Sequence, residues 1–394
     1  MRLCLASRTL LRPRRTRRPS GVRLSACLRL ATVLLAAGCS SNGAAGADAR
    51  TGDGGTGDAT AADARAIDAA PAVPAVHFVG RHDDSNPDRV RFGWPGTGMV
   101  IRFRGTGASV VLDDPAGYFA LVVDGEVKPR LETTPGERSY PLASDLAEGE
   151  HTVELYRRTE GFFGPTSFLG EEIVGDLLAV PPPTRRIEIL GDSITCGYGN
   201  EGPDQYCNFS AETENHFLTY GAIAARALGA ELSTIAWSGK GVIYNYGDDT
   251  VEPLPELFDR TLPTSAAPVW GFAWQPDVVV INLGTNDFST NNDPGELLFV
   301  GAYVALLERL RERYPGALIL CTVAPLLGEP DRTTVITYLD SAIAQRAAAG
   351  DTLVERIDLS VPTEGWGCDW HPSIATHESM AQALIAILQA RLSW

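Results

Sequence analysis

The chain has 394 residues, which is more than one compact core usually holds, and its 44% hydrophobic content is ordinary for globular domains. Residues 1–38 hold nine arginines and no acidic residue, so the rest of the chain has 24 basic against 49 acidic residues. A strongly acidic protein repels phosphates, which excludes nucleic acid as a partner.

The first 38 residues are typical of an export signal. An arginine-rich leader precedes CLRLATVLLAAG, an apolar run too short to span a membrane. The segment LLAAGCSS resembles a bacterial lipobox with Cys39 as the lipidated residue, although Ala36 stands where leucine is usual. We expect an exported lipoprotein at the bacterial cell envelope or surface, attached to the membrane only through Cys39. Plain secretion is the alternative.

Two segments of different composition follow the signal. Residues 39–74 are rich in alanine, glycine and aspartate and predict a disordered linker, with an acidic ligand-binding tail as the alternative. Residues 75–180 contain short alternating runs broken by glycine and proline: GMVIRFRG, ASVVLDD, YFALVVDG and HTVELYRR. This pattern predicts an antiparallel β-sandwich, and VPPPT at 180–184 marks its boundary.

From residue 184 to 394 the pattern alternates strand and helix. The predicted strands are RIEIL, LSTIAW, DVVVINLG, ALILCTVAP and TLVERIDL, and the predicted helices are Phe217–Leu228, Glu296–Arg313, Val335–Ala348 and Ala375–Leu392. A continuously apolar run such as VVVINL is typical of a central parallel strand covered on both faces. The segment therefore predicts a doubly wound α/β domain, which binds its ligand beyond the carboxyl ends of the strands.

Residues suited to catalysis follow three of these strands, and a fourth such residue lies in a loop before the last helix. GDSI places Ser193 after the first strand, SGKG places Gly239 after the second, GTND places Asn286 after the third, and WHP places His371 in a loop. A serine needs a base to become a nucleophile, and its oxyanion intermediate needs fixed donors. The other histidines fall in the sandwich or in helices, which leaves His371 as the candidate base.

The four blocks together resemble the SGNH (GDSL-type) esterases, and RRIEILGDSITCGYGN resembles carbohydrate esterase family 2. The similarity covers residues 77 to 394 and includes YRRTEG in the first domain. It implies a jelly-roll domain before a flavodoxin-like three-layer hydrolase domain. It also implies Ser193 as nucleophile and His371 as general base and acid. The amides of Ser193 and Gly239 and the side chain of Asn286 would form the oxyanion hole, without cofactor or metal, while Asp192 braces the turn.

The substrate that this resemblance implies is an acetylated polysaccharide such as xylan or glucomannan, with 6-O-acetyl groups preferred. A lipase, a thioesterase or a peptidoglycan O-acetylesterase would share the machinery, but the chain lacks a long apolar lid-like stretch. A non-catalytic carbohydrate-binding protein is the other alternative. Taken singly, each block also has a structural explanation, such as a helix N-cap at Ser193 or a turn at Asn286. The sequence carries no signal for an oligomeric state.

One position departs from the SGNH pattern. These enzymes usually have an aspartate three residues before the histidine, to orient its ring. Here that position is Cys368, and Asp369 lies only two residues before His371. Either Asp369 reaches the ring through a shifted loop, or a backbone carbonyl orients the ring and the enzyme works as a dyad. The dyad is the favoured alternative.

Cysteines and aromatic residues complete the candidate set. Four cysteines lie beyond the lipobox, an even number that allows two disulfides in an oxidising compartment; the expected pairs are Cys196–Cys207 and Cys321–Cys368, with unpaired buried thiols as the alternative. No C-x-x-C pair supports a metal site. Trp370, Trp237 and Tyr244 fall near the site loops and are candidates for stacking on sugar rings, with core packing as the alternative.

Overall fold

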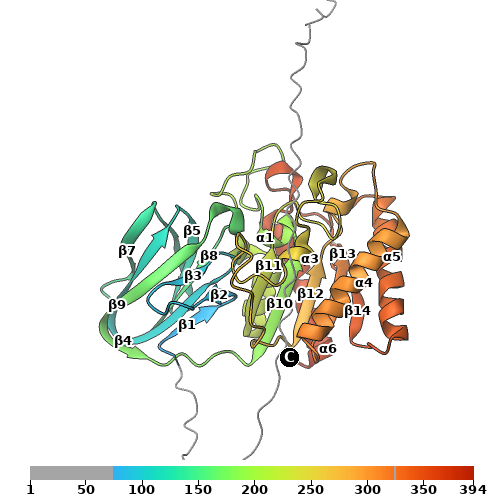
Figure 1. The fold of residues 1–394 in the computed structure, drawn as a ribbon. Coiled ribbons are helices and arrows are strands. Elements are labelled where there is room, and N and C mark those ends of the chain that lie inside the picture. Colours follow the sequence, from blue (N-terminus) through green and yellow to red (C-terminus); the bar gives the residue numbers. More distant parts are fainter. Residues whose placement is uncertain (1–73, 324) are drawn as a thin grey trace, which may run out of the picture. The chain divides into compact units, whose positions relative to one another are not determined.

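The structure is a computed structural model that describes residues 74–323 and 325–394 (Figure 1). The predicted export signal, Cys39 and all but the end of the predicted linker lie outside these residues. Within the described residues, no helix combines the length and the apolar character needed to cross a membrane.

The N-terminal domain is built from nine strands whose pairings are all antiparallel. The strands are β1 (Val76–Val79), β2 (His82–Asp83), β3 (Val90–Phe92), β4 (Gly98–Asp114), β5 (Tyr118–Val123), β6 (Glu126–Glu132), β7 (Gly136–Ala143), β8 (Gly149–Arg157) and β9 (Thr166–Leu178). A short 3₁₀ helix, η1 (Gly161–Phe163), lies between the last two. The predicted antiparallel, sheet-rich domain is confirmed, while its jelly-roll topology stays a prediction.

Strand β4 differs from its prediction. GMVIRFRG and ASVVLDD were expected as separate strands, but they form one strand of 17 residues. The register with β9 shifts between Gly105 and Gly107, so the glycine that indicated a turn instead makes a bulge within the strand. Buried and partly buried residues alternate along most of β4, and Phe103 and Val110 contribute to the core of this domain.

The C-terminal domain contains a five-stranded parallel sheet in the order β11-β10-β12-β13-β14. Its strands are β10 (Arg185–Gly191), β11 (Ala230–Ala236), β12 (Val278–Asn282), β13 (Leu318–Val323) and β14 (Val354–Asp358). Its helices are α1 (Ser193–Cys196), α2 (Tyr220–Leu228), α3 (Leu254–Leu257), α4 (Glu296–Arg313), α5 (Asp331–Ala348) and α6 (Ile374–Leu392), with 3₁₀ turns η2 (His216–Leu218), η3 (Tyr246–Asp248), η4 (Asn286–Phe288) and η5 (Cys368–Trp370). The predicted α/β domain is confirmed.

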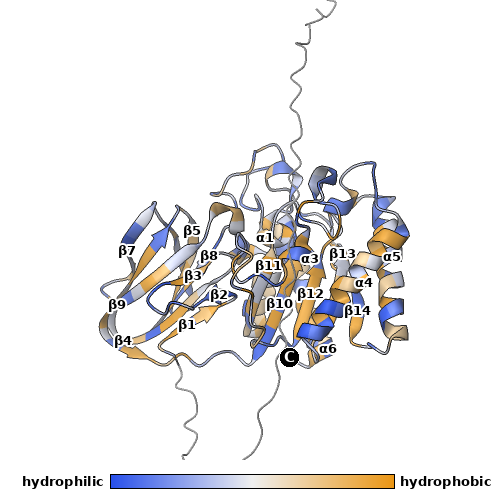
Figure 2. Cartoon of the chain, in the orientation of Figure 1, coloured by the Kyte–Doolittle hydropathy of each residue, from blue (hydrophilic) through white to orange (hydrophobic). Residues whose placement is uncertain are grey.

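Helices cover both faces of this sheet, which explains its continuously apolar strands (Figure 2). Alternate residues of β12 point to opposite faces: Val279 packs in the cluster that contains α3, α4 and α5, and Val280 packs in the cluster that contains α2 and α6. Helix α3 was not predicted. It packs its apolar side chains into the core, where Leu254 and Leu257 are fully buried.

The strand order places three chain segments at one edge of the sheet. Strand β10 lies between β11 and β12, and its last residue, Gly191, pairs with Ala236 on one side and Asn282 on the other. All three strands are parallel, so the segments that leave their carboxyl ends start at the same level. This is the point where the strand order reverses, and doubly wound sheets bind their ligands at such a point.

The two domains are joined by a buried ion pair. Arg81 of the N-terminal domain donates to Glu188 in the middle of β10 at 3.0 Å, and both side chains are almost completely buried. The same guanidinium donates to the carbonyl oxygens of Phe258 and Arg260 and lies over the Phe258 ring. Each of these partners belongs to the C-terminal domain.

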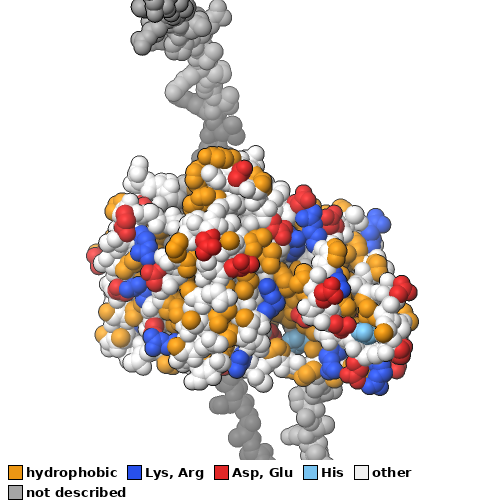
Figure 3. Space-filling model, turned by 180° about the vertical axis from the view of Figure 1, so that it is seen from behind, with side chains coloured by type: hydrophobic (Ala, Val, Ile, Leu, Met, Phe, Trp, Pro, Cys, Tyr) orange, Lys and Arg blue, Asp and Glu red, His pale blue; other side chains and the backbone are white. Residues whose placement is uncertain are grey.

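Charges of both signs are interspersed on the face drawn in Figure 3, where the side chains of the described residues form no broad basic area. Partly exposed ion pairs of the described residues include Arg130–Glu212 and Arg346–Glu308.

Candidate active site

The turn after β10 displays the hydroxyl of Ser193. The side chain of Asp192 accepts a hydrogen bond from the amide of Ile194 at 3.0 Å and so caps helix α1, which begins at Ser193. A Cβ atom on Gly191 would lie 2.0 Å from the hydroxyl of Thr195, so only glycine allows the helix to return so closely to the strand. The strand therefore runs directly into a tight turn with the serine at its tip.

His371 lies in contact with Ser193, although 178 residues separate them. Its Nε2 atom is 2.8 Å from the Ser193 Oγ atom. Its Nδ1 atom is 3.1 Å from the backbone carbonyl oxygen of Asp369. A neutral imidazole with its proton on Nδ1 donates to this carbonyl, which leaves Nε2 to accept the serine proton. This is the arrangement of a nucleophile with its general base.

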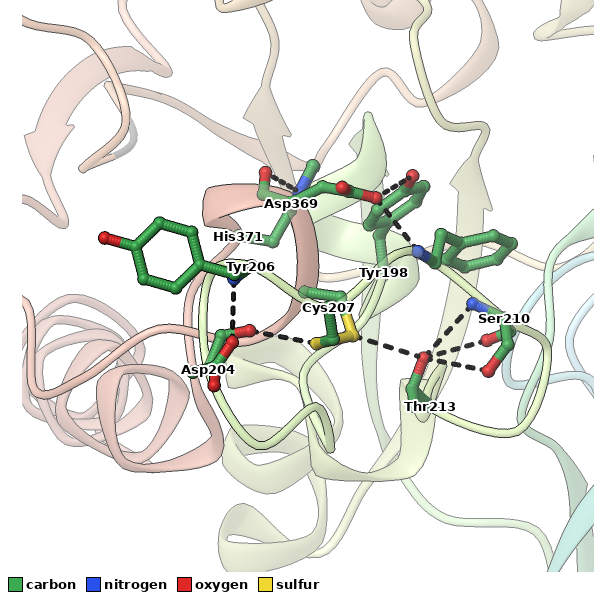
Figure 4. Close-up of a disulfide and its surroundings, with 10 residues drawn as sticks. Tyr198, Asp204, Tyr206, Cys207, Ser210, Thr213, Asp369 and His371 are labelled. Carbon is green, nitrogen blue, oxygen red and sulfur yellow. Dashed lines mark hydrogen bonds between the residues drawn. A yellow bond between two sulfur atoms is a disulfide. The ribbon is translucent and has the colours of Figure 1, made fainter.

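The carboxylate of Asp369 points away from the imidazole (Figure 4). It accepts hydrogen bonds from the hydroxyl of Tyr198 at 3.0 Å and from the amide of Phe209 at 2.9 Å. Asp369 itself adopts a left-handed conformation, with φ at 50°, which turns its carbonyl toward His371. The geometry is thus that of a dyad, in which the backbone of Asp369 orients the histidine and its side chain anchors the loop.

We expect Asp369→Asn to retain most of the activity. An orienting aspartate in a triad is worth about 10⁴-fold in kcat, because the amide favours the wrong tautomer of the histidine. Here the Asn side-chain oxygen can still accept from Tyr198 and Phe209, and the carbonyl that faces His371 is unchanged. The kcat for an aryl acetate should fall less than about tenfold. A loss near 10⁴-fold would instead show that the carboxylate orients the ring during turnover.

The loop before His371 is held by a disulfide that differs from the expected pairing. Cys207 pairs with Cys368, across 161 residues of sequence, whereas Cys196 and Cys321 are free and buried. The expected pairs Cys196–Cys207 and Cys321–Cys368 are therefore wrong. Cys321 lies inside β13 and faces the core, and Cys196 is the buried last residue of helix α1, so neither reaches the loops that Figure 4 shows joined.

The His371 ring is partly buried and lies against an aromatic ring. The ring of Tyr198 lies against it, with the two centroids 4.2 Å apart. Burial lowers the pKa of His371 from its ordinary value of 6.5, and the hydrogen bonds to backbone carbonyls only partly offset this effect. The neutral, proton-accepting form therefore prevails at neutral pH.

The lowered pKa predicts how activity depends on pH. A general base works only in its neutral form, which exists above its pKa, so kcat/KM should be lost on the acid side with a midpoint below 6.5. The measurement is kcat/KM for an aryl acetate between about pH 4 and 8. Asp192 also titrates in this range, because burial raises its pKa to about 7. An Asp192→Asn variant that keeps the same midpoint assigns the titration to His371, and a midpoint above 6.5 contradicts the prediction.

Two backbone amides and one side-chain amide are the candidate donors of the oxyanion hole. Among residues 74–323 and 325–394, neither Ser193 N–H nor Gly239 N–H has an acceptor. Gly239 has φ at 79°, a conformation that favours glycine. The Asn286 side chain donates to the Lys240 carbonyl at 2.9 Å, and its contact with Asp192 is long, 3.4 Å, so its second hydrogen is only weakly held.

The neighbouring Asp287 shapes the loop that carries Gly239. Its carboxylate accepts hydrogen bonds from three successive amides, those of Val242, Ile243 and Tyr244, at 2.8 to 3.0 Å. Burial raises the pKa of Asp287, while these amides stabilise its charged form. The GTND block therefore contributes in two ways. Asn286 is a candidate site residue, and Asp287 holds the loop that follows SGKG in shape.

The aromatic candidates are only partly at the surface. Trp370 is 52% exposed beside His371, whereas Trp237 packs against the hydrophobic core and Tyr244 is half buried. Sequence reasoning missed Tyr206 and Tyr246, which are 76% and 72% exposed. Tyr206 meets the Trp370 ring edge-on. The signal in the sequence was that both tyrosines lie in glycine-rich loops next to the four blocks.

The remaining histidines are engaged away from Ser193. His77, His82 and His151 contact Glu231, the Gly80 carbonyl and Asp124, respectively, and His216 and His377 contact Thr234 and the Tyr220 amide. Burial lowers the pKa of both His216 and His377 to about 3, so these two stay neutral and serve the packing of α2. The elimination that selected His371 agrees with these contacts.

The fold and the site together define a GDSL-like hydrolase, and sequence comparison narrows the class. Residues 189–378 match the GDSL-like Lipase/Acylhydrolase family, and residues 78–183 match the family described as Carbohydrate esterase 2 N-terminal. The chain belongs to carbohydrate esterase family 2. As a member of this family it is a carboxylic ester hydrolase.

Individual relatives agree with this assignment. The chain is 40% identical to Cellulase/esterase CelE of Acetivibrio thermocellus over 82% of its own length, but it spans only 40% of that longer protein. It is 30% identical to an acetylxylan esterase / glucomannan deacetylase of Cellvibrio japonicus, covering 78% of this chain and 87% of the relative. A solved family two carbohydrate esterase from Clostridium thermocellum, in complex with cellohexaose, superimposes with a TM-score of 0.78 at 38% identity, covering 81% of this chain and 99% of the other.

Proposed function

We propose that this protein is a serine esterase that removes O-acetyl groups from polysaccharides through an acetyl-enzyme intermediate. The contact of 2.8 Å between Ser193 Oγ and His371 Nε2 carries the proposal, because the Asp369 carbonyl also holds the ring in the tautomer that accepts a proton. A serine hydroxyl alone is a poor nucleophile at neutral pH, and the adjacent histidine activates it by accepting its proton.

The reaction proceeds in two balanced halves. Ser193 Oγ attacks the acetyl carbonyl as its proton passes to His371 Nε2, and the oxyanion lies among the Ser193 amide, the Gly239 amide and the Asn286 side chain. The sugar oxygen then leaves and takes the proton from His371, and the acetyl group stays on Ser193. Water attacks the acetyl-enzyme and gives its proton to His371, after which acetic acid departs and Ser193 regains its hydrogen.

Exposed aromatic rings beside the dyad support a sugar as the alcohol part of the substrate. Trp370 adjoins His371 in sequence, and the rings of Tyr206 and Trp366 lie against it with centroids 5.8 and 5.7 Å away. Flat rings of this kind provide apolar contact to the faces of pyranose rings at low entropic cost. The names of the relatives point to xylan and glucomannan, and we propose these polymers, acetylated and with 6-O-acetyl groups preferred, as the substrates.

Acetic acid release from acetylated xylan, acetylated glucomannan and O-acetylated peptidoglycan tests the substrate class. We expect release from the two plant polysaccharides and little from peptidoglycan. In parallel, hydrolysis of an aryl acetate should greatly exceed that of an aryl octanoate, which separates an acetyl esterase from a lipase or thioesterase. Preference for the octanoate, or release from peptidoglycan alone, would contradict the proposed substrate.

Export and lipidation at Cys39 belong to the same proposal, since a polymer of the plant cell wall is reached only outside the cell. The basic leader and the short apolar run before Cys39 support them. Cys39→Ser should convert a protein that sediments with membranes into a released one. Equal membrane association of both forms would overturn the lipid anchor.

A further inference from the structure

Glu160 of the N-terminal domain reaches into the active-site region of the C-terminal domain. It follows β8 in the YRRTEG segment and is fully buried. Its carboxylate accepts two hydrogen bonds from Ser238: one oxygen accepts from the amide at 2.7 Å, and the other accepts from the hydroxyl. Ser238 is the residue immediately before Gly239. A side chain of one domain thus holds the oxyanion-hole loop of the other.

The Gly239 amide lies between two anchors. On one side, Glu160 fixes both the backbone and the side chain of Ser238. On the other side, the Gly239 carbonyl accepts from the Tyr246 amide at 2.7 Å. Gly239 has a wide choice of backbone angles because it lacks a Cβ, so its N–H direction is set by these neighbours. Without the first anchor, the amide would be free to rotate away from a developing oxyanion.

A second buried carboxyl accompanies Glu160. Glu214 of the C-terminal domain is also fully buried, and it accepts a hydrogen bond from the Glu160 amide at 3.2 Å. One carboxyl oxygen of each residue and the Cys196 sulfur all lie within 4.8 Å of one another. Cys196 belongs to the helix that begins at Ser193. The pair is therefore packed directly behind the nucleophile.

The hydrogen bonds of this cluster favour Glu160 as the carboxylate and Glu214 as the neutral acid. Burial raises the pKa of both groups, and the effect is stronger for Glu214. Two adjacent buried carboxyls do not both ionise, so one keeps a proton. Glu160 is the one that accepts two hydrogen bonds from Ser238, and these stabilise its charged form.

We propose that Glu160 is a positioning residue for catalysis, which fixes Ser238 so that the Gly239 amide points at the reacting carbonyl. This inference rests on the proposed function, since it concerns the oxyanion hole of that reaction. It also assigns a role in catalysis to the N-terminal domain, which contributes Glu160 to the hydrolase site.

Three variants test this role through kcat and KM for an aryl acetate. Loss of one oxyanion donor costs about 10²- to 10³-fold in kcat, so a misaligned donor in Glu160→Ala should cost about 30- to 100-fold with KM changed less than about threefold. Glu160→Gln can still accept from the Ser238 amide and donate to its hydroxyl, and it should recover kcat to within about fivefold of the wild type. Arg130→Ala, which cuts an exposed contact with Glu212 between the same domains, should leave both constants unchanged.

Wild-type kcat in a folded Glu160→Ala protein, or an equal loss in Arg130→Ala, would overturn the inference. If Glu160→Ala does not fold, Ser238→Ala decides, because it removes one of the two anchoring bonds; it should lower kcat by about tenfold at constant KM, and an unchanged kcat would overturn the inference. Ser193→Ala is measured alongside. If Ser193→Ala keeps its turnover, the proposed function itself is wrong. If Ser193→Ala is inactive but Glu160→Ala is fully active, only the positioning role of Glu160 is wrong.

Discussion

Replacing Ser193 with alanine is expected to lower kcat for an aryl acetate on the order of 10⁵-fold, because removal of a serine nucleophile leaves only oxyanion stabilisation and binding. The fold should persist, since the Ser193 hydroxyl hydrogen-bonds only to His371 among the described residues and the Asp192 side chain, not that of Ser193, caps the helix. The measurement is initial-rate kinetics together with the thermal unfolding midpoint of both proteins.

A matched control for this variant is Ser139→Ala. Ser139 is an exposed serine of the N-terminal domain whose hydroxyl contacts Glu172, away from the catalytic dyad. Its substitution should leave kcat and KM unchanged. A serine-directed phosphonate should label the wild type and the Ser139→Ala protein, but not Ser193→Ala. Labelling of Ser193→Ala at the wild-type rate would move the nucleophile to another residue.

Replacing His371 with alanine is expected to cost about as much as the loss of Ser193, on the order of 10⁵-fold in kcat, because a general base and its nucleophile act as a unit. Nothing else among the described residues lies within hydrogen-bond distance of the Ser193 hydroxyl to accept its proton. The double variant Ser193→Ala/His371→Ala should therefore be no slower than either single variant. Additive losses would show that the two residues act independently.

His151→Ala serves as the control for the histidine. His151 lies at the surface of the N-terminal domain against Asp124, and its ring takes no part in the site. This variant should keep wild-type kcat. A large loss in His151→Ala, or a His371→Ala protein with a normal rate, would contradict the assignment of the base.

The long, periodic elements of the C-terminal domain were predictable from sequence. Helix α4 was expected at Glu296–Arg313 and is found with these bounds, because apolar residues recur at helical spacing along it. The run VVVINL was expected as a central strand and forms β12. The continuity of β4 was not predictable, since Gly105 reads locally as a turn and becomes a bulge only when β9 pairs beside it.

The convergence of the candidate site residues was predictable for a similar reason. Parallel strands end at one edge, so residues that directly follow them lie near one another, and this brought Ser193 and Gly239 to the same edge. Contacts that depend on the path of a loop were not readable. Asp369 turns its carbonyl to His371 only because of its left-handed backbone, and the pairing of Cys207 with Cys368 depends on two loops that are distant in sequence.

The buried pair of Arg81 and Glu188 limits how this protein can be shortened. A truncation that begins at β10 would leave Glu188 inside the sheet without its counter-charge, and it would uncover the aromatic surface of Phe258 on which the guanidinium rests. Stranding a charge in this way costs about 3–5 kcal/mol, a large share of the stability of most domains. The hydrolase portion is therefore not an autonomous module, and grafting it onto another scaffold requires that the N-terminal domain be transferred with it.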